Sequence, residues 1–178
     1  MKALFAWLAI ALPMLAQAGW VDPQGRPLPD TPSMRSSGDF GVQLLLTDDE
    51  KAFRHTWNTS RQTPQLKTTN KISAGQEISG VLIFSGCAVG AKQACDVSAE
   101  FSIQAPDGTV TPGGRGIVWP RPPLGPRILM LGQASMTVGF AKDDAPGTYQ
   151  LVALVTDHVA RKTLRLTSAF ELAPHPRP

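Results

Sequence analysis

The chain has 178 residues, 17 of them basic and 14 acidic, and a formal net charge of +3. A charge this balanced does not by itself favour nucleic acid or an anionic membrane surface as the partner. The length matches one ordinary domain with a sizeable hydrophobic core once a leader is removed.

Residues 1–18 have the pattern of a cleavable export signal. Lys2 gives a positive start, an apolar stretch follows, and Ala16-Gln17-Ala18 has the A-x-A form of a cleavage site. The apolar stretch is too short to cross a bilayer comfortably, although an uncleaved membrane anchor is the alternative. We therefore expect a periplasmic or secreted bacterial protein that begins at Gly19 and has no stable membrane insertion.

Residues 19–38 are rich in proline, which interrupts helices and strand ladders, and this predicts an extended arm. Trp20 is unusual there: it either packs onto the domain or anchors a partner. The domain itself is expected over residues 39–173, with a loose tail at 174–178.

The first strand is expected at Asp39–Leu46, followed by a short helix. Thr47-Asp48-Asp49-Glu50 has the spacing of a capping box, in which the Thr and Glu side chains satisfy backbone donors at the start of a helix. Phe53 and Trp57 lie four residues apart and share one face of this helix. The two aspartates then belong to its first turn. The alternative is a catalytic carboxylate pair or a cation site.

Two different strand patterns flank the chain's two cysteines. Residues 78–84 are apolar or small at almost every position, which is typical of a central strand covered on both faces. Residues 97–105 alternate between apolar and polar side chains, as in a strand with one buried and one wet face. A Pro-Asp-Gly turn at residues 106–108 ends that strand.

Cys87 and Cys95 are predicted to form a disulfide that staples these two strands as an antiparallel hairpin, at its turn end. An oxidising compartment permits such a bond. A metal pair or a redox pair is the alternative, but seven residues separate the cysteines and no histidine is nearby in sequence.

Residues 111–127 combine many prolines and glycines with Arg115, Arg121, Arg127 and Trp119. We interpret this stretch as a stiff loop, and these four residues as candidate partner-binding residues, because arginine and tryptophan are enriched at interface hot spots. The alternative is a crossing between two sheets, with Trp119 capping the core.

Short strands are expected at residues 128–131 and 136–140. The Pro146-Gly147 turn then leads through Tyr149, the chain's one tyrosine, into a long apolar strand. This resembles the tyrosine corner of immunoglobulin-like sandwiches, in which the hydroxyl bonds the backbone a few residues upstream. The last strand, residues 162–172, places Leu164, Leu166, Phe170 and Leu172 on its inner side.

About eight strands, one short helix near the N-terminus and no β-α-β alternation predict an all-β, antiparallel sandwich. Residues 145–172 resemble the closing hairpin of bacterial exported immunoglobulin-like and macroglobulin-type domains. The resemblance implies an immunoglobulin-like fold and transfers no functional residue.

No pattern in the chain indicates catalysis. The three histidines, His55, His158 and His175, are scattered, and an oxidised cysteine is no nucleophile. We expect no enzyme, cofactor or metal, and no nucleic acid. The remaining hypothesis is a periplasmic interaction module that binds another exported protein. Its alternatives are an inhibitor or immunity-type protein that neutralises an enzyme, and a subunit or chaperone-like component of an envelope assembly.

Overall fold

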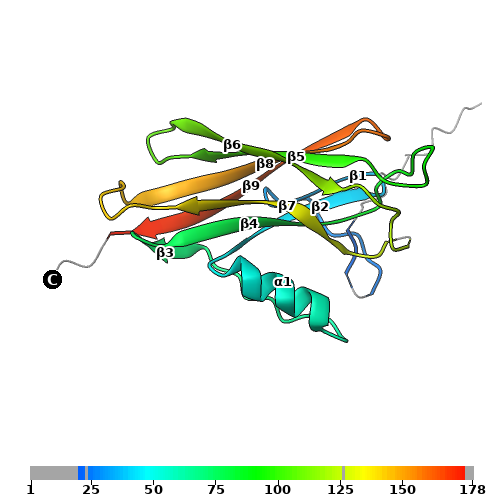
Figure 1. Ribbon diagram of the computed structural model, residues 1–178, viewed down its shortest axis with the longest axis horizontal. Helices are drawn as coiled ribbons and strands as arrows, with labels where there is room; N and C mark the ends of the chain where they lie inside the picture. The colour runs from blue at the N-terminus through cyan, green and yellow to red at the C-terminus, as the bar shows by residue number, and fades with distance from the viewer. Residues whose placement is uncertain (1–19, 23, 126, 175–178) are drawn as a thin grey trace, which may run out of the picture.

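The computed structural model describes residues 20–22, 24–125 and 127–174 (Figure 1). The expected leader, Gly19 and most of the tail lie outside these residues. Within the described part, no helix is long and apolar enough to cross a membrane. The elements found there are β1 (Met34–Ser37), β2 (Phe40–Thr47), α1 (Glu50–Thr59), β3 (Lys71–Ser73), β4 (Glu77–Ser85), β5 (Val97–Gln104), β6 (Val110–Trp119), β7 (Met130–Gly139), β8 (Gly147–Asp157) and β9 (Lys162–Ala173).

The strands form two facing sheets, of order β1-β2-β4-β7 and β3-β9-β8-β5-β6. All pairs are antiparallel except β3 with β9. The predicted all-β sandwich with one short helix is therefore confirmed, with nine strands among the described residues where about eight were expected.

The main core lies between the two sheets and follows the period-two patterns of the sequence. On β9 the four residues predicted to face inward are all buried, and on β5 the residues Val97, Ala99 and Phe101 are buried in the same way. Burying each large side chain contributes about 1.5–3 kcal/mol.

Strand β4 is buried on both faces, as its continuous apolar run predicts. Leu82 and Phe84 enter the main core, while Val81 and Ile83 pack into a second cluster on the other side of the sheet. Phe53 of α1 belongs to that second cluster, so the helix covers the outer face of the four-stranded sheet (Figure 1).

The disulfide between Cys87 and Cys95 is present, with a Cα–Cα distance of 5.9 Å, but the predicted hairpin is wrong. Strands β4 and β5 lie in different sheets. Both edges of β4 are paired, with β2 and β7, so neither edge is free for β5, which pairs with β6 and β8 instead. The disulfide therefore closes the loop that crosses between the sheets.

The N-terminal arm is more ordered than its prolines predict. Its last residues form the edge strand β1, and Trp20 is buried against the outer cluster, where its indole N–H donates to the Arg35 carbonyl at 3.1 Å. Of the two hypotheses for Trp20, the structure therefore supports packing onto the domain.

The capping box is wrong by two residues. Asp49 is the N-cap of α1, and its carboxylate accepts the Ala52 N–H at 2.9 Å. Thr47 cannot take that place because it still pairs with Ser79 in the sheet. Its hydroxyl instead accepts the Asp49 N–H.

Two further boundaries differ from the sequence prediction. The two short strands expected over residues 128–140 are the single strand β7. The expected loop at 111–127 begins only after Trp119, because β6 already occupies residues 110–119. Edge strands tolerate proline. Packing also explains the glycine at position 113, because a Cβ there would lie 2.5 Å from the Met136 sulfur of β7.

The turn before β8 has the predicted tyrosine-corner bond. The Tyr149 hydroxyl donates to the Ala145 carbonyl at 2.9 Å. Its ring packs with Phe140 and Phe170 at centroid distances of 5.0 and 5.8 Å. Gly147 has φ +144°, and a Cβ there would lie 2.9 Å from Pro106, which explains why glycine occupies this position.

Candidate functional site

Trp119, the predicted anchor, lies at the end of β6 and is only 7% exposed. Its ring meets Phe84 edge to face at 5.8 Å, and its indole N–H donates to the Pro122 carbonyl at 3.1 Å. Trp119 therefore caps the core, as the alternative hypothesis expects, and only a small part of it faces outward.

The other three candidate residues do not form one site with it. Arg121 stacks over Trp119, with its guanidinium carbon 4.3 Å from the ring centroid, within the range of a cation–π contact. Arg115 lies on β6 and pairs with Glu100 of β5. Arg127 is exposed near the other end of the loop and has φ +60°.

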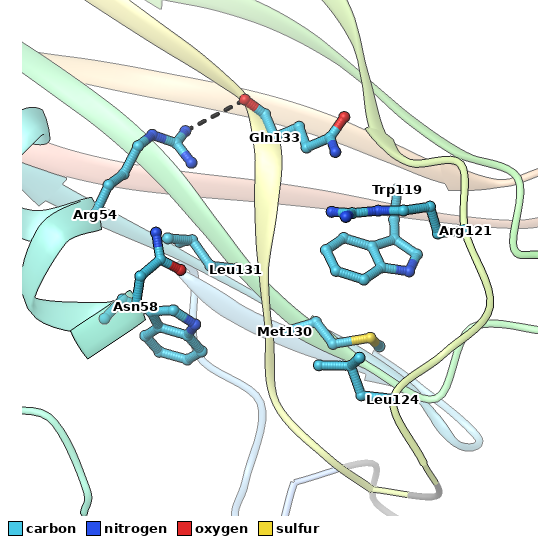
Figure 2. Close-up of a pocket in the computed structure, with 9 residues that line it drawn as sticks. Arg54, Asn58, Trp119, Arg121, Leu124, Met130, Leu131 and Gln133 are labelled. Carbon is cyan, nitrogen blue, oxygen red and sulfur yellow. Dashed lines mark hydrogen bonds between the residues drawn. The ribbon is translucent and has the colours of Figure 1, made fainter. Parts of the chain in front are cut away.

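Arg121 and Trp119 line a pocket of about 350 Å³ between α1, the β6–β7 loop and β7. We call it the helix–loop pocket (Figure 2). Figure 2 places Leu131 and Met130 between the helix on one side and the Trp119–Arg121 stack on the other. Its lining residues are Arg54, Trp57, Asn58, Trp119, Arg121, Leu124, Met130, Leu131 and Gln133.

The helix side of the pocket is fixed by Arg54. Its Nε donates to Glu50 at 2.6 Å, and its terminal nitrogens donate to the carbonyls of Gly132 and Gln133 at 2.9 and 3.3 Å. Glu50 also accepts the Ser135 hydroxyl at 2.7 Å. These bonds tie α1 to β7, so the wall of the pocket is preorganised.

Glu50 keeps its charge in this network. Burial raises the pKa of its carboxyl, but the hydrogen bonds from Ser135 and Arg54 and the positive charge of Arg54 outweigh burial, and the net pKa lies below its ordinary value. Glu50 therefore neutralises Arg54, whereas Arg121 has no carboxylate partner within the described residues.

The pocket opens on one end of the sandwich, which we call the loop end. It consists of the β4–β5 loop (86–96), the β6–β7 loop (120–129, with residue 126 outside the described residues) and the β8–β9 turn (158–161) (Figure 1). The loop end and the adjoining end of β6 carry six of the exposed large apolar side chains, namely Val89, Ile117, Leu124, Ile128, Leu129 and Val159.

Ile117 and Val159 line a second hollow, of about 420 Å³, beside the disulfide. Pro120 lines it too, while its neighbours Trp119 and Arg121 line the helix–loop pocket. The segment that leaves β6 therefore separates two hollows.

Asp157 joins two of the three segments, the β4–β5 loop and the β8–β9 turn, and it was missed at the sequence level. It is fully buried, and its carboxylate accepts the Ala88 N–H at 2.7 Å and the N–H groups of Val159 and Ala160 at 3.0 Å. The Cys95 N–H donates to the Arg121 carbonyl at 3.0 Å, which ties the second loop to the first. The only sequence signal is an acidic residue at the end of an apolar strand, which is typical of many turns.

The histidines are not brought together. His55 is exposed on α1, and His175 lies outside the described residues. His158 contacts the Ser98 hydroxyl through Nε2 at 2.7 Å on an exposed face, and neither residue lines the pockets described above. In the part of the chain that the structure describes, no group of three or more His, Cys, Asp and Glu residues is placed to hold a metal ion.

No family model and no curated protein matches the sequence. Among solved structures, the chain is similar to a family 123 glycoside hydrolase from Clostridium perfringens, with 10% identity over 77% of this chain and 28% of that chain and a TM-score of 0.43. It is also similar to the alkylpurine DNA glycosylase AlkC of Pseudomonas fluorescens, with 13% identity over 58% and 27% of the two chains and a TM-score of 0.36.

The chain thus spans less than a third of the length of these two proteins. Likenesses at these TM-scores carry no argument about activity. The resemblance to immunoglobulin-like domains stays a prediction, and what the chain binds has to be argued from its own surface.

Proposed function

We propose that the chain is an exported, non-enzymatic interaction module of the bacterial periplasm, and that it binds another exported protein through the loop end. The observation that carries this proposal is the exposed apolar surface there. Leu124 is 64% exposed and Ile117 is 59% exposed. Contiguous exposed apolar side chains mark interaction surfaces on otherwise polar proteins.

The loop end is also preorganised, which supports the proposal. The disulfide, the buried Asp157 carboxylate and the Trp119–Pro122 hydrogen bond hold its segments in place before any partner arrives. A rigid surface loses less conformational entropy on binding than a flexible one, so more of the contact energy appears as affinity.

The charge of the loop end favours an acidic partner surface. The three segments contain four basic side chains and one exposed acidic side chain, that of Asp96, and the adjoining β1–β2 turn adds the exposed Asp39. The basic side chains are Lys92, Arg121, Arg127 and Arg161. Complementary charge raises the rate of association and selects among partners.

Site-specific photo-crosslinking in the cells that export the chain tests this proposal. The crosslinking amino acid p-benzoylphenylalanine replaces Leu124 in the loop end or Ile117 at the adjoining end of β6; these two are called the loop-end positions. In matched controls it replaces Val110 or Leu154, which are exposed apolar residues elsewhere. We expect one discrete crosslinked protein from both loop-end positions and none from the controls.

Equal crosslinking at all four positions, or none at the loop end, would contradict the proposal. The identity of the captured protein decides between its versions. A single enzyme whose activity falls on binding indicates an inhibitor or immunity-type protein. Several envelope proteins in one complex indicate an assembly subunit or a chaperone-like component.

A further inference from the structure

We propose that the helix–loop pocket is the point at which the partner is recognised, and that it receives a glutamate or aspartate side chain from an internal, apolar segment of that protein. This inference rests on the proposed function, because it names what the loop end recognises. It is argued from the charges, contacts and shape of the pocket.

The first step is the charge of the pocket. Two arginines, Arg54 and Arg121, line it, and no carboxylate does. Arg54 is neutralised by Glu50, and both of its terminal nitrogens already donate to carbonyls of β7. Arg121 is therefore the cation left to meet a ligand.

The second step is the geometry of Arg121. Its guanidinium lies over the Trp119 ring, which covers one face of the group, and it extends from the loop toward the side of the pocket where Leu131 and the helix lie (Figure 2). An arginine held in this way presents a fixed fork of donors that fits the two oxygens of a carboxylate. Lysine has no such fork, so it is no substitute here.

The third step is the rest of the lining. Leu124, Met130 and Leu131 give the pocket an apolar part, and Asn58 and Gln133 add neutral polar groups. Its volume of about 350 Å³ lies within the range of sites that enclose small groups. An acidic side chain with one apolar neighbour from the same segment satisfies both parts of the pocket.

The fourth step excludes other surfaces of the same charge. Arg115 is already paired with Glu100. Arg127 is exposed on the same loop as Arg121, but it does not line the helix–loop pocket. Arg127 is therefore the matched control for Arg121: it has the same charge, lies on the same loop and is also exposed, but it does not stack on Trp119.

The test titrates three short peptides into the exported, oxidised chain and follows backbone and tryptophan indole N–H signals by NMR. The peptides are acetyl-Leu-Glu-Leu-amide, acetyl-Leu-Gln-Leu-amide and acetyl-Leu-Gln-Leu with a free terminal carboxylate. We expect the Glu peptide to shift the Trp119 indole signal and to bind at least about tenfold more tightly than the Gln amide. Arg121→Gln should remove this difference, and Arg127→Gln should keep it.

Equal binding of the Glu and Gln amides would overturn the inference, as would loss of the difference in Arg127→Gln alone. If the free-carboxylate peptide binds most tightly, the pocket recognises a C-terminal carboxylate and not an internal acidic side chain, which would overturn the inference. Concentration-dependent shifts without any peptide would mean that a second copy of the chain occupies the pocket, which also overturns it.

The two proposals fail separately. If no peptide binds while Leu124 and Ile117 still crosslink to one protein, the pocket inference is wrong and the loop end keeps its function. If the Glu peptide binds in the expected way but the loop end crosslinks to nothing, the proposed partner protein is wrong. A melting temperature within about 2 °C of the parent protein shows that Arg121→Gln still folds, so its loss of binding counts.

Discussion

The two ends of the sandwich are closed in different ways. At one end, which we call the corner end, the turn before β8 packs Tyr149 against Phe140 and Phe170, and the neighbouring loops 105–109 and 140–146 expose mainly polar groups. At the loop end, a disulfide and a buried carboxylate hold the segments, and apolar side chains remain outside. The corner end is closed by burial of aromatic rings, whereas the loop end combines one buried ring, that of Trp119, with bonds that leave other apolar side chains exposed.

Charge separates the two ends as well. The corner-end loops contain Asp107, Asp143 and Asp144 with one basic residue, Lys142, while the loop end has its excess of basic residues. A molecule with opposite charges at its two ends orients itself in the field of a charged partner before contact. The two ends therefore differ in what they leave exposed: the loop end combines a capped core with exposed apolar side chains, and the corner-end loops do not. The predictions below test that division.

The largest effect is expected from Trp119→Ala. The substitution removes a nearly buried ring that contacts Phe84 and donates to Pro122, so the free energy of unfolding should fall by about 4 kcal/mol. Urea denaturation measures the change. Trp57→Ala is the control, because Trp57 lines the same pocket but is only half-buried, and we expect a smaller loss.

An unchanged free energy of unfolding in Trp119→Ala would mean that the indole is not part of the core. Trp119 would then return to the role of an exposed anchor, and the loop end would no longer combine a capped core with a free apolar surface.

The next effect is expected from Asp157→Ala, which removes the carboxylate that joins two segments of the loop end. Three backbone N–H groups lose their acceptor, so the free energy of unfolding should fall by about 3 kcal/mol. Asp96→Ala is the control: Asp96 is an exposed acid of the same end, and we expect a change within about 0.5 kcal/mol. Similar losses in both variants would show that net charge, and not the buried hydrogen bonds, matters here.

The disulfide should contribute somewhat less. Replacing both cysteines, Cys87→Ser with Cys95→Ser, should cost about 2.5 kcal/mol, because a short closed loop restricts the unfolded chain only moderately. The native protein, unfolded without reductant, should bind no thiol reagent. Two labelled thiols would contradict the bond, and a loss well above the expected value would show that the loop end depends on it more than on Asp157.

The sequence predicted those features that depend on residues close together in the chain. The alternation on β5 and β9 follows from side chains that point to opposite faces. The tyrosine-corner bond reaches only from Tyr149 to Ala145, and a signal-like leader made a disulfide plausible. These features need no knowledge of which strands are neighbours.

What the sequence did not predict depends on contacts between distant residues. The assignment of β4 and β5 to different sheets is a matter of long-range pairing. The prolines and glycines of β6 predicted a loop instead of a strand. They are explained by the edge position of β6 and by the nearby Met136 side chain, which the sequence does not show. One wall of the helix–loop pocket depends on the hydrogen bond from Arg54 to the carbonyl of Gly132, 78 positions later. No local sequence pattern predicts a contact between residues so far apart.

The smallest effect is expected at the corner end. Tyr149→Phe keeps the ring and its aromatic contacts but deletes the hydrogen bond to Ala145, so the free energy of unfolding should fall by about 1 kcal/mol. Binding at the loop end should not change, because the substitution lies at the opposite end of the sandwich. If Tyr149→Phe weakens partner binding as much as Arg121→Gln does, the division between the two ends is wrong.

Tyr149 also leads to a prediction about the pH dependence of stability, for which Tyr149→Phe is the control. Burial of the Tyr149 hydroxyl, together with the nearby negative charges of Asp144 and Asp107, raises its pKa in the folded protein. The fold therefore favours the protonated hydroxyl, which donates to Ala145. This contribution is complete below the ordinary tyrosine pKa of about 10 and is lost as the pH rises through the higher folded value. The stability difference between the parent protein and Tyr149→Phe should thus stay constant near neutral pH and shrink above about pH 10, measured by urea denaturation at each pH. A difference that persists unchanged into strong alkali would mean that the hydroxyl contributes through packing, and the corner end would then owe its stability to the aromatic rings alone.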